Sequence, residues 1–202
     1  MFETKNDYSF NKELPKNIIL ITPPSLFLMD ERVFVNLGIL KIGAVLENFG
    51  VGVEHLDLSG ISNYIDALKS HLIQSEAEFL GITVTTPQLP SVVKIIETVK
   101  EVKPGIKIIL GGPHITLTHS AVKLEKKNGN IGRAHSSLNK LLKLADTLVT
   151  GDGEKAIFLA LNKNAPRITD ADDPLTGLFL TDQIYDLTPY PARHLVEMSS
   201  YK

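Results

Sequence analysis

The sequence predicts an α/β fold built on a parallel sheet, and two observations carry that prediction. Short apolar runs of strand length alternate with longer segments of helical spacing along most of the 202 residues. The runs are apolar at nearly every position, as expected of strands that helices cover on both faces. Against a usual size of about 100–200 residues per domain, the length corresponds to one domain with a short appendage.

Five apolar runs are predicted to form the strands of this sheet. Most of them end at turns rich in Pro, Gly or Thr, which are the residues that interrupt regular structure or cap it. The predicted strands span residues 17–22, 51–56, 79–84, 107–110 and 147–150.

The segments between these runs have the apolar periodicity of helices. Pro104 and Gly105 end the third helix, and the turn residues 128–130 divide the long segment 121–145 into two expected helical pieces. The predicted helices span residues 37–49, 61–75, 91–103, 121–145 and a last stretch that ends at Leu161.

Three regions are expected along the chain. Residues 1–16 form a polar N-terminal arm, residues 17–162 form the α/β domain, and residues 163–202 form a C-terminal extension. Within the extension, residues 177–185 are predicted to form a short strand or hairpin, and residues 186–193 read as a linker.

Composition excludes several kinds of chemistry. The chain has no cysteine, so it holds no disulfide, zinc–thiolate site or iron–sulfur cluster on its own thiolates. Its net charge of −2 gives no electrostatic reason to expect a nucleic acid or an anionic membrane as partner. The N-terminus lacks the apolar core of a signal peptide, and no apolar run approaches the roughly 20 residues of a membrane span. We therefore expect a cytoplasmic protein.

Unusual residues gather directly after the predicted strands. Because ligands of open parallel sheets bind beyond the carboxyl ends of the strands, these turns mark a candidate site. Glycines there let the backbone approach a ligand, and threonine hydroxyls offer donors and acceptors. Each turn also has a plain structural explanation, but four of them at one edge favour a large ligand with phosphate, ribose and amide groups. The turns are Thr22-Pro23-Pro24, residues 83–87, residues 111–114 and residues 151–154.

Taken in order, these motifs resemble one family. The first strand with its Pro-Pro turn, Leu37-Gly38, the GITVTT run at 81–86, GGPHIT from Gly111 and GDGE from Gly151 are similar to the N-terminal cobalamin-binding domain of cobalamin-dependent radical S-adenosylmethionine enzymes. The closing DLTPYPAR, residues 186–193, resembles the linker that leads those proteins into their iron–sulfur domain. The resemblance spans residues 17–195.

The resemblance implies a flavodoxin-like, Rossmann-type doubly wound sheet of five strands in the order 2-1-3-4-5. It also implies cobalamin at the carboxyl edge of that sheet, with the nucleotide tail in a slot between the loops. The implied cofactor-binding residues are Pro23, Gly38, Thr83, Thr85, Thr86, Gly111, Gly112, Pro113, His114, Gly151, Gly153 and Glu154. No catalytic residue is expected in this chain.

Two absences distinguish the sequence from related cobalamin proteins. Residues 22–38 contain no histidine, where domains of the methionine-synthase type carry the lower cobalt ligand, so we expect no protein ligand on the metal. His55 is expected to be a core or edge histidine. The three-cysteine motif of radical enzymes is also missing, so S-adenosylmethionine and a 4Fe-4S cluster are expected only in a radical S-adenosylmethionine domain elsewhere in a full-length chain or in a separate subunit. The resemblance therefore implies a cobalamin-binding module of a methyltransferase-type enzyme, which is not expected to be catalytic alone.

Two other functions stay open from the residues themselves. The first is a flavodoxin-like flavin enzyme or electron carrier, which Pro23 and Pro24 disfavour because they remove amide donors from the loop that would bind phosphate. The second is a receiver-like signalling domain, which would need an aspartate after the third strand, where the chain has threonines at 83, 85 and 86.

Overall fold

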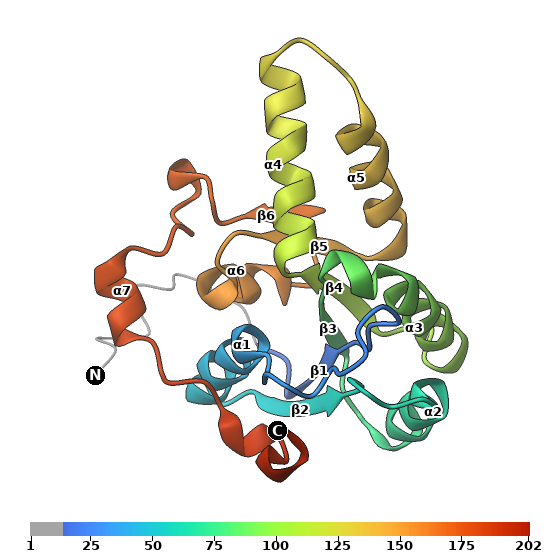
Figure 1. Ribbon diagram of the computed structural model, residues 1–202. Coiled ribbons are helices and arrows are strands. Elements are labelled where there is room, and N and C mark those ends of the chain that lie inside the picture. The colour runs from blue at the N-terminus through green and yellow to red at the C-terminus, as the bar shows by residue number, and fades with distance from the viewer. Residues whose placement is uncertain (1–13) are drawn as a thin grey trace.

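The computed structural model describes residues 14–202, so most of the predicted N-terminal arm lies outside the described residues. One sheet forms the centre of the molecule, with its strands in the order β2-β1-β3-β4-β5-β6 and every neighbouring pair parallel (Figure 1). The predicted order 2-1-3-4-5 is confirmed, and a sixth strand extends it beside β5. The strands are β1 (Asn17–Thr22), β2 (Gly52–Asp57), β3 (Phe79–Thr83), β4 (Lys107–Gly111), β5 (Thr147–Thr150) and β6 (Ile168–Asp170).

Helices cover both faces of the sheet, as in other doubly wound folds. Four of them pack on one face and contribute to one apolar cluster, and two more pack on the opposite face. The first face carries α2 (Tyr64–Gln74), α3 (Leu89–Val102), α4 (Pro113–Lys127) and α5 (Arg133–Leu144), and the second carries α1 (Leu37–Asn48) and α6 (Gly153–Ala160).

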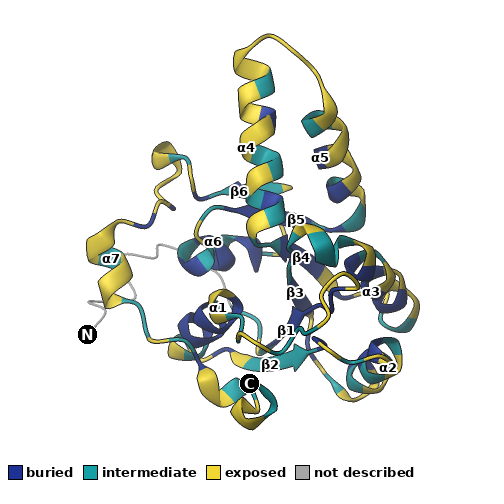
Figure 2. Cartoon of the chain, in the orientation of Figure 1, coloured by how far each residue is buried: buried dark blue, intermediate teal, exposed yellow. Residues whose placement is uncertain are grey.

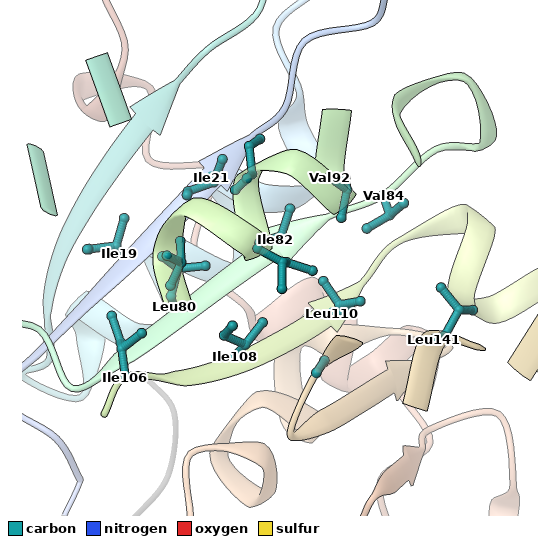
Figure 3. Close-up of a cluster of buried hydrophobic side chains, with 14 of the residues drawn as sticks. Ile19, Ile21, Leu80, Ile82, Val84, Val92, Ile106, Ile108, Leu110 and Leu141 are labelled. Atoms are coloured by element: carbon teal, nitrogen blue, oxygen red, sulfur yellow. The ribbon is translucent and has the colours of Figure 1, made fainter. Parts of the chain in front are cut away.

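The strands divide their side chains between these two clusters because successive residues of a strand point to opposite faces. In β1, Ile19 and Ile21 join the cluster under α2 and α3, while Ile18 and Leu20 join the cluster under α1 and α6. Figure 3 shows the first cluster, with Ile19 lying near Leu80 on the neighbouring strand. Burying one such side chain contributes about 1.5–3 kcal/mol, so the two clusters are the main source of stability.

A helical hairpin connects β4 to β5 and extends away from the sheet, with much of its surface exposed (Figure 2). Its two helices are separated at residues 128–132, which confirms the predicted division. The Glu125 carboxylate stabilises the turn between the helices. It accepts hydrogen bonds from the backbone N–H groups of Gly132 at 3.0 Å, Ala134 at 2.9 Å and His135 at 3.1 Å. Nδ1 of His135 lies 2.8 Å from the same carboxylate. Glu125 thus supplies the cap that the start of α5 lacks in its own sequence.

We expect the start of α5 to lose protection when Glu125 is neutralised. The hydrogen bond from His135 and the backbone N–H bonds lower the pKa of Glu125 from 4.5 to about 2. A carboxyl group with a lowered pKa in the fold stabilises it above its unfolded pKa, and this contribution disappears as the pH falls from about 4.5 toward 2. Glu125→Gln should abolish that pH dependence, as measured by amide exchange at Ala134 and His135. Equal pH dependence in both proteins would contradict this assignment.

The C-terminal extension differs from its prediction in one element. Residues 177–185 form neither strand nor hairpin; instead a helix, α7 (Asp182–Leu187), begins after Thr181, whose hydroxyl accepts a hydrogen bond from Ile184 N at 3.4 Å. The strand of the extension lies earlier, at β6. The prediction was wrong because the alternating buried Leu178 and Leu180 imitate a strand without a neighbour to pair with.

The last residues pack back against α1 and β2. Ala192 N donates a hydrogen bond to Leu40 O at 3.0 Å, and the Tyr201 hydroxyl donates one to the carboxylate of Asp57. Arg32, in the loop after β1, lies 3.8 Å from the same carboxylate and over the Tyr201 ring. The chain's end, β2 and the loop after β1 therefore form one contact region. Among residues 14–202, no helix combines the length and apolar character needed to cross a membrane.

Candidate functional site

A cavity of about 410 Å³ opens at the carboxyl edge of the sheet, between the sheet and the helices α1 and α6. Its position follows from topology: the chain leaves β1 for β2 on one side and returns to β3 on the other, so the loops after these strands diverge there. The residues that line it are Leu20, Asn36, Gly38, Ile39, Ile42, Gly81, Ile82, Thr83, Thr85, Ile109, Gly111, Gly112, Pro113, Val149, Gly151, Asp152, Gly153, Glu154 and Ile157.

The floor of the cavity is apolar and comes from four neighbouring strands. Leu20, Ile109 and Val149 point to the α1 and α6 face, and Gly81 lies between them on β3. A glycine inside a central strand weakens the sheet unless something else approaches the backbone there. A Cβ at Gly81 would lie 3.0 Å from the Leu20 side chain. The missing side chain at Gly81 therefore leaves room above the middle of the sheet.

The loops after β3 and β4 are joined to each other by backbone hydrogen bonds. Val84 N donates to Gly111 O at 2.8 Å, and His114 N donates to Val84 O at 2.9 Å. Gly112, between them, has a φ of +94°, and a Cβ there would come within 2.8 Å of Val84 N and Thr83 Oγ1. Only glycine meets both conditions without a shift of the backbone.

Gln88 connects this part of the rim to the turn after β1. Its side-chain oxygen accepts from Thr85 N at 3.0 Å and from the Thr85 hydroxyl at 2.8 Å. Its amide nitrogen donates to Pro23 O at 2.7 Å. The turns after β1 and β3 are thus held together by one side chain, and this contact was not foreseen from the sequence.

Nine of the twelve sequence-predicted site residues line the cavity and three do not. Pro23 is buried, and its carbonyl oxygen accepts the hydrogen bond from the Gln88 amide that joins the turns after β1 and β3. Thr86 and His114 lie beside the cavity, where Thr86 Oγ1 and His114 Nδ1 are 3.0 Å apart. Burial lowers the pKa of His114, which favours its neutral form. The nine lining residues are Gly38, Thr83, Thr85, Gly111, Gly112, Pro113, Gly151, Gly153 and Glu154.

Ten lining residues were not among the twelve predicted site residues, although Gly81, Ile82 and Asp152 lie within the motifs named above. Seven are large apolar residues of strands and helices, whose buried pattern is the same whether they face a cavity or a packed core. Asn36 and Gly81 carried usable signals: the Asn36 side chain caps α1 by accepting from Ile39 N at 3.2 Å, and Gly81 interrupts an otherwise bulky strand. The missed residues are Leu20, Asn36, Ile39, Ile42, Gly81, Ile82, Ile109, Val149, Asp152 and Ile157.

Two carboxyl groups are the only ionisable side chains among the lining residues in the described part of the chain. Glu154 is buried at the first turn of α6, and burial, reinforced by Asp152, raises its pKa, while a hydrogen bond from its own backbone N–H and the Lys41 ammonium oppose the shift. Asp152 lies at the rim, where partial loss of water and the Asp172 carboxylate raise its pKa. The cavity is therefore acidic on the side of β5 and α6 and polar but uncharged on the side of β3 and β4.

No histidine is among the lining residues of the cavity in the described part of the chain. His55, on β2, is a linking residue: its Nδ1 donates to Leu195 O at 3.3 Å, so its Nε2 accepts from the Thr22 hydroxyl at 3.1 Å. Burial lowers the pKa of His55, which suits this neutral tautomer. Within residues 14–202, no group of three or more His, Cys, Asp or Glu side chains is arranged to hold a metal ion.

The fold is that of a flavodoxin-like domain, and its cavity lies at the carboxyl edge of the sheet, where ligands of such sheets bind. A family model described as the B12 binding domain matches residues 31–141, which is more than half of the chain. The chain therefore belongs to the family of B12-binding domains, and its cofactor is cobalamin.

Solved structures with a similar fold belong to longer proteins. Two structures of the radical S-adenosylmethionine methyltransferase TsrM from Kitasatospora setae match at 18% identity over 72% of this chain, with TM-scores of 0.52 and 0.51. One is bound to tryptophan and a SAM analogue, and the other to cobalamin and a [4Fe-4S] cluster. The match covers 25% and 24% of those chains, so this chain spans about a quarter of their length. A comparison with curated proteins finds no match.

Proposed function

We propose that this cobalamin-binding domain is the cofactor module of a radical S-adenosylmethionine enzyme of the methyltransferase type. The observation that carries the proposal is the cavity at the switch point, where the segments after β3, β4 and β5 bring eight motif residues to one rim and the start of α1 adds Gly38. The shared fold with a methyltransferase that binds both cobalamin and a [4Fe-4S] cluster supports the same assignment.

The residues of the cavity fit the nucleotide tail of cobalamin. Gly81 leaves space over an apolar floor, as an aromatic base requires, and Thr83 and Thr85 bring hydroxyl groups to the wall. Gly111, Gly112, Gly151 and Gly153 leave backbone unshielded where the phosphate and ribose would pass. Pro23 and Gly38 would shape the loop beneath the corrin, with Thr86 and His114 outside the tail slot. Bound cobalamin supplies the methyl-carrying cobalt; the chain binds it, orients it and keeps water from its base.

The catalytic partner must bring the cluster, because this chain has no cysteine. A radical S-adenosylmethionine domain, in the same polypeptide or a separate subunit, would cover the exposed apolar side chains that follow β1 at the edge where the cavity opens. Phe27 is 71% exposed, Met29 fully exposed and Phe34 85% exposed. We expect such an enzyme in the cytoplasm, where thiolate ligands stay reduced.

A flavin is a poorer ligand for this cavity than cobalamin. The terminal phosphate of a flavin mononucleotide is usually bound by cations or by unshielded amides. Here Pro23 and Pro24 remove amide donors from the loop after β1, where that phosphate would bind. A receiver domain is disfavoured because Thr83 and Gly111 end β3 and β4, where an acceptor Asp and a Lys would be needed.

Reconstitution with hydroxocobalamin tests the proposal. The protein is incubated with the corrinoid, desalted and examined by absorption spectroscopy. We expect about one equivalent to be retained, without the spectral features of imidazole coordination, because no histidine lines the cavity in the described residues. Loss of the corrinoid on desalting, together with retention of flavin mononucleotide, would overturn the assignment. Imidazole coordination would overturn the predicted absence of a protein ligand and would direct mutation to His114.

A further inference from the structure

The amide group of the Gln88 side chain is paired with backbone at both of its ends. Gln88 is the last residue of a short 3-10 helix, η1 (Thr86–Gln88), between β3 and α3. Its side-chain oxygen lies 3.0 Å from Thr85 N, and its amide nitrogen lies 2.7 Å from Pro23 O. Because a backbone N–H only donates and a carbonyl oxygen only accepts, these two contacts fix which end of the amide faces which neighbour.

This fixed orientation determines the direction of a third hydrogen bond. The Thr85 hydroxyl lies 2.8 Å from the same Gln88 oxygen, which has no proton to give, so the hydroxyl must donate. Its single proton is therefore taken up by Gln88, while Thr85 itself lines the cavity. Toward a ligand in the cavity, the hydroxyl oxygen can only accept a hydrogen bond.

Local turn geometry accounts for only part of this arrangement. The bond from Thr85 N to the Gln88 side chain belongs to a capping box, which closes the turn after β3. A capping box needs only the side-chain oxygen of Gln88, and it does not determine where the amide nitrogen binds. The bond from that nitrogen reaches Pro23, 65 positions away along the chain, and joins the turns after β1 and β3. Gln88 thus orients Thr85 from a position that is itself held by a second loop.

We infer that Gln88 is a positioning residue, which holds the Thr85 hydroxyl as an acceptor for a ribose hydroxyl of the nucleotide tail. The inference rests on the proposed function and deepens it, because it names what this wall of the cavity recognises. In the nucleotide of cobalamin, the phosphate oxygens and the free ring nitrogen of the base are acceptors, whereas the ribose hydroxyls are donors. A hydroxyl that can only accept therefore matches the sugar and not the phosphate.

The test measures how Thr85→Val changes the affinity for hydroxocobalamin with and without Gln88. Valine has nearly the shape of threonine but cannot accept a hydrogen bond, so we expect the affinity to fall roughly tenfold. In the Gln88→Met background the same substitution should cost less than about threefold, because the hydroxyl is no longer held in place. Thr85→Ser keeps the hydroxyl and should bind within about twofold of wild-type protein.

Cobinamide, a corrinoid without the nucleotide, shows which part of the cofactor donates to Thr85. Its affinity is measured by titration with absorption spectroscopy in wild-type protein and in Thr85→Val. We expect the two values to agree within about twofold, because the ribose is missing from this ligand. A loss equal to that for hydroxocobalamin would place the donor on an amide of the corrin and would overturn the inference.

Two matched substitutions control for the changes themselves. Thr83→Val removes a hydroxyl from the same wall, but the Gln88 amide pairs with Thr85 and Pro23, so the effect of Thr83→Val should be equal in both backgrounds. Gln74→Met, at the exposed end of α2, should retain hydroxocobalamin as wild-type protein does.

The same cost of Thr85→Val with and without Gln88 overturns the inference. If Gln88→Met is poorly folded, the comparison of Thr85→Val with Thr85→Ser decides by itself: equal affinities of these two variants for hydroxocobalamin overturn the inference as well. Failure of wild-type protein to retain hydroxocobalamin overturns the proposed function instead.

Discussion

Gly81→Val is expected to abolish retention of cobalamin while the domain stays folded. The valine side chain would enter the space above β3 that we assign to the nucleotide tail, and the Leu20 methyl group, 3.0 Å from the new Cβ, would be pushed further into it. Valine also suits a central strand better than glycine does, so the sheet should not weaken. We expect the affinity for hydroxocobalamin to fall at least about 100-fold, which corresponds to about 2.7 kcal/mol.

A matched control separates the cavity from a general effect of valine. Gly105 lies in the turn before β4, at the opposite edge of the sheet, and a Cβ there would have nothing within 4 Å. Gly105→Val should retain the corrinoid as wild-type protein does. If Gly81→Val also retained it, with the same circular dichroism spectrum and melting temperature, the tail would not lie over β3 and the assignment of the cavity would be wrong.

The alternation of strands and helices was predictable because the central strands β1, β3 and β4 carry apolar runs that end at recognisable turns. The start of α4 was not: Gly-Gly-Pro-His was assigned to a loop, although Pro113 is the first residue of a helix, a position that proline favours. β6 was not predicted because it has only three residues, of which only Thr169 is buried. A strand so short is defined by its neighbour β5 and not by its own pattern.

The site was predictable where it is made of turns and unpredictable where it is made of strands. Glycines and threonines after strands indicate a ligand edge, but they do not say which face of the sheet opens. That choice depends on Gly81, whose position opposite Leu20 and Ile109 exists only once the strands are paired in register. The same limit applies to His114, which does not line the cavity and instead has its Nδ1 3.0 Å from Thr86 Oγ1.

Gly112→Ala is expected to destabilise the protein even without a ligand. A residue other than glycine is strained at a φ of +94°, and the new methyl group would come within 2.8 Å of Val84 N, which is held by its hydrogen bond to Gly111 O. Strain at one such position costs roughly 1–3 kcal/mol, which we expect to see as a lower midpoint in urea denaturation. Since Val84 also accepts from His114 N, the loops after β3 and β4 should separate together, and cobalamin retention should fall with stability.

Gly111→Ala, one residue earlier, is not expected to destabilise the protein. Its φ lies outside the left-handed region, and a Cβ would meet only Val149 at the ordinary distance of 3.8 Å. Alanine there restricts the unfolded chain without straining the fold, so the free energy of unfolding should stay the same or rise by about 0.4–1 kcal/mol. Two adjacent glycines should thus respond in opposite directions to the same substitution. A similar loss of stability in both variants would mean that the turn is generally intolerant of side chains, and that the conformation assigned to Gly112 is not its cause.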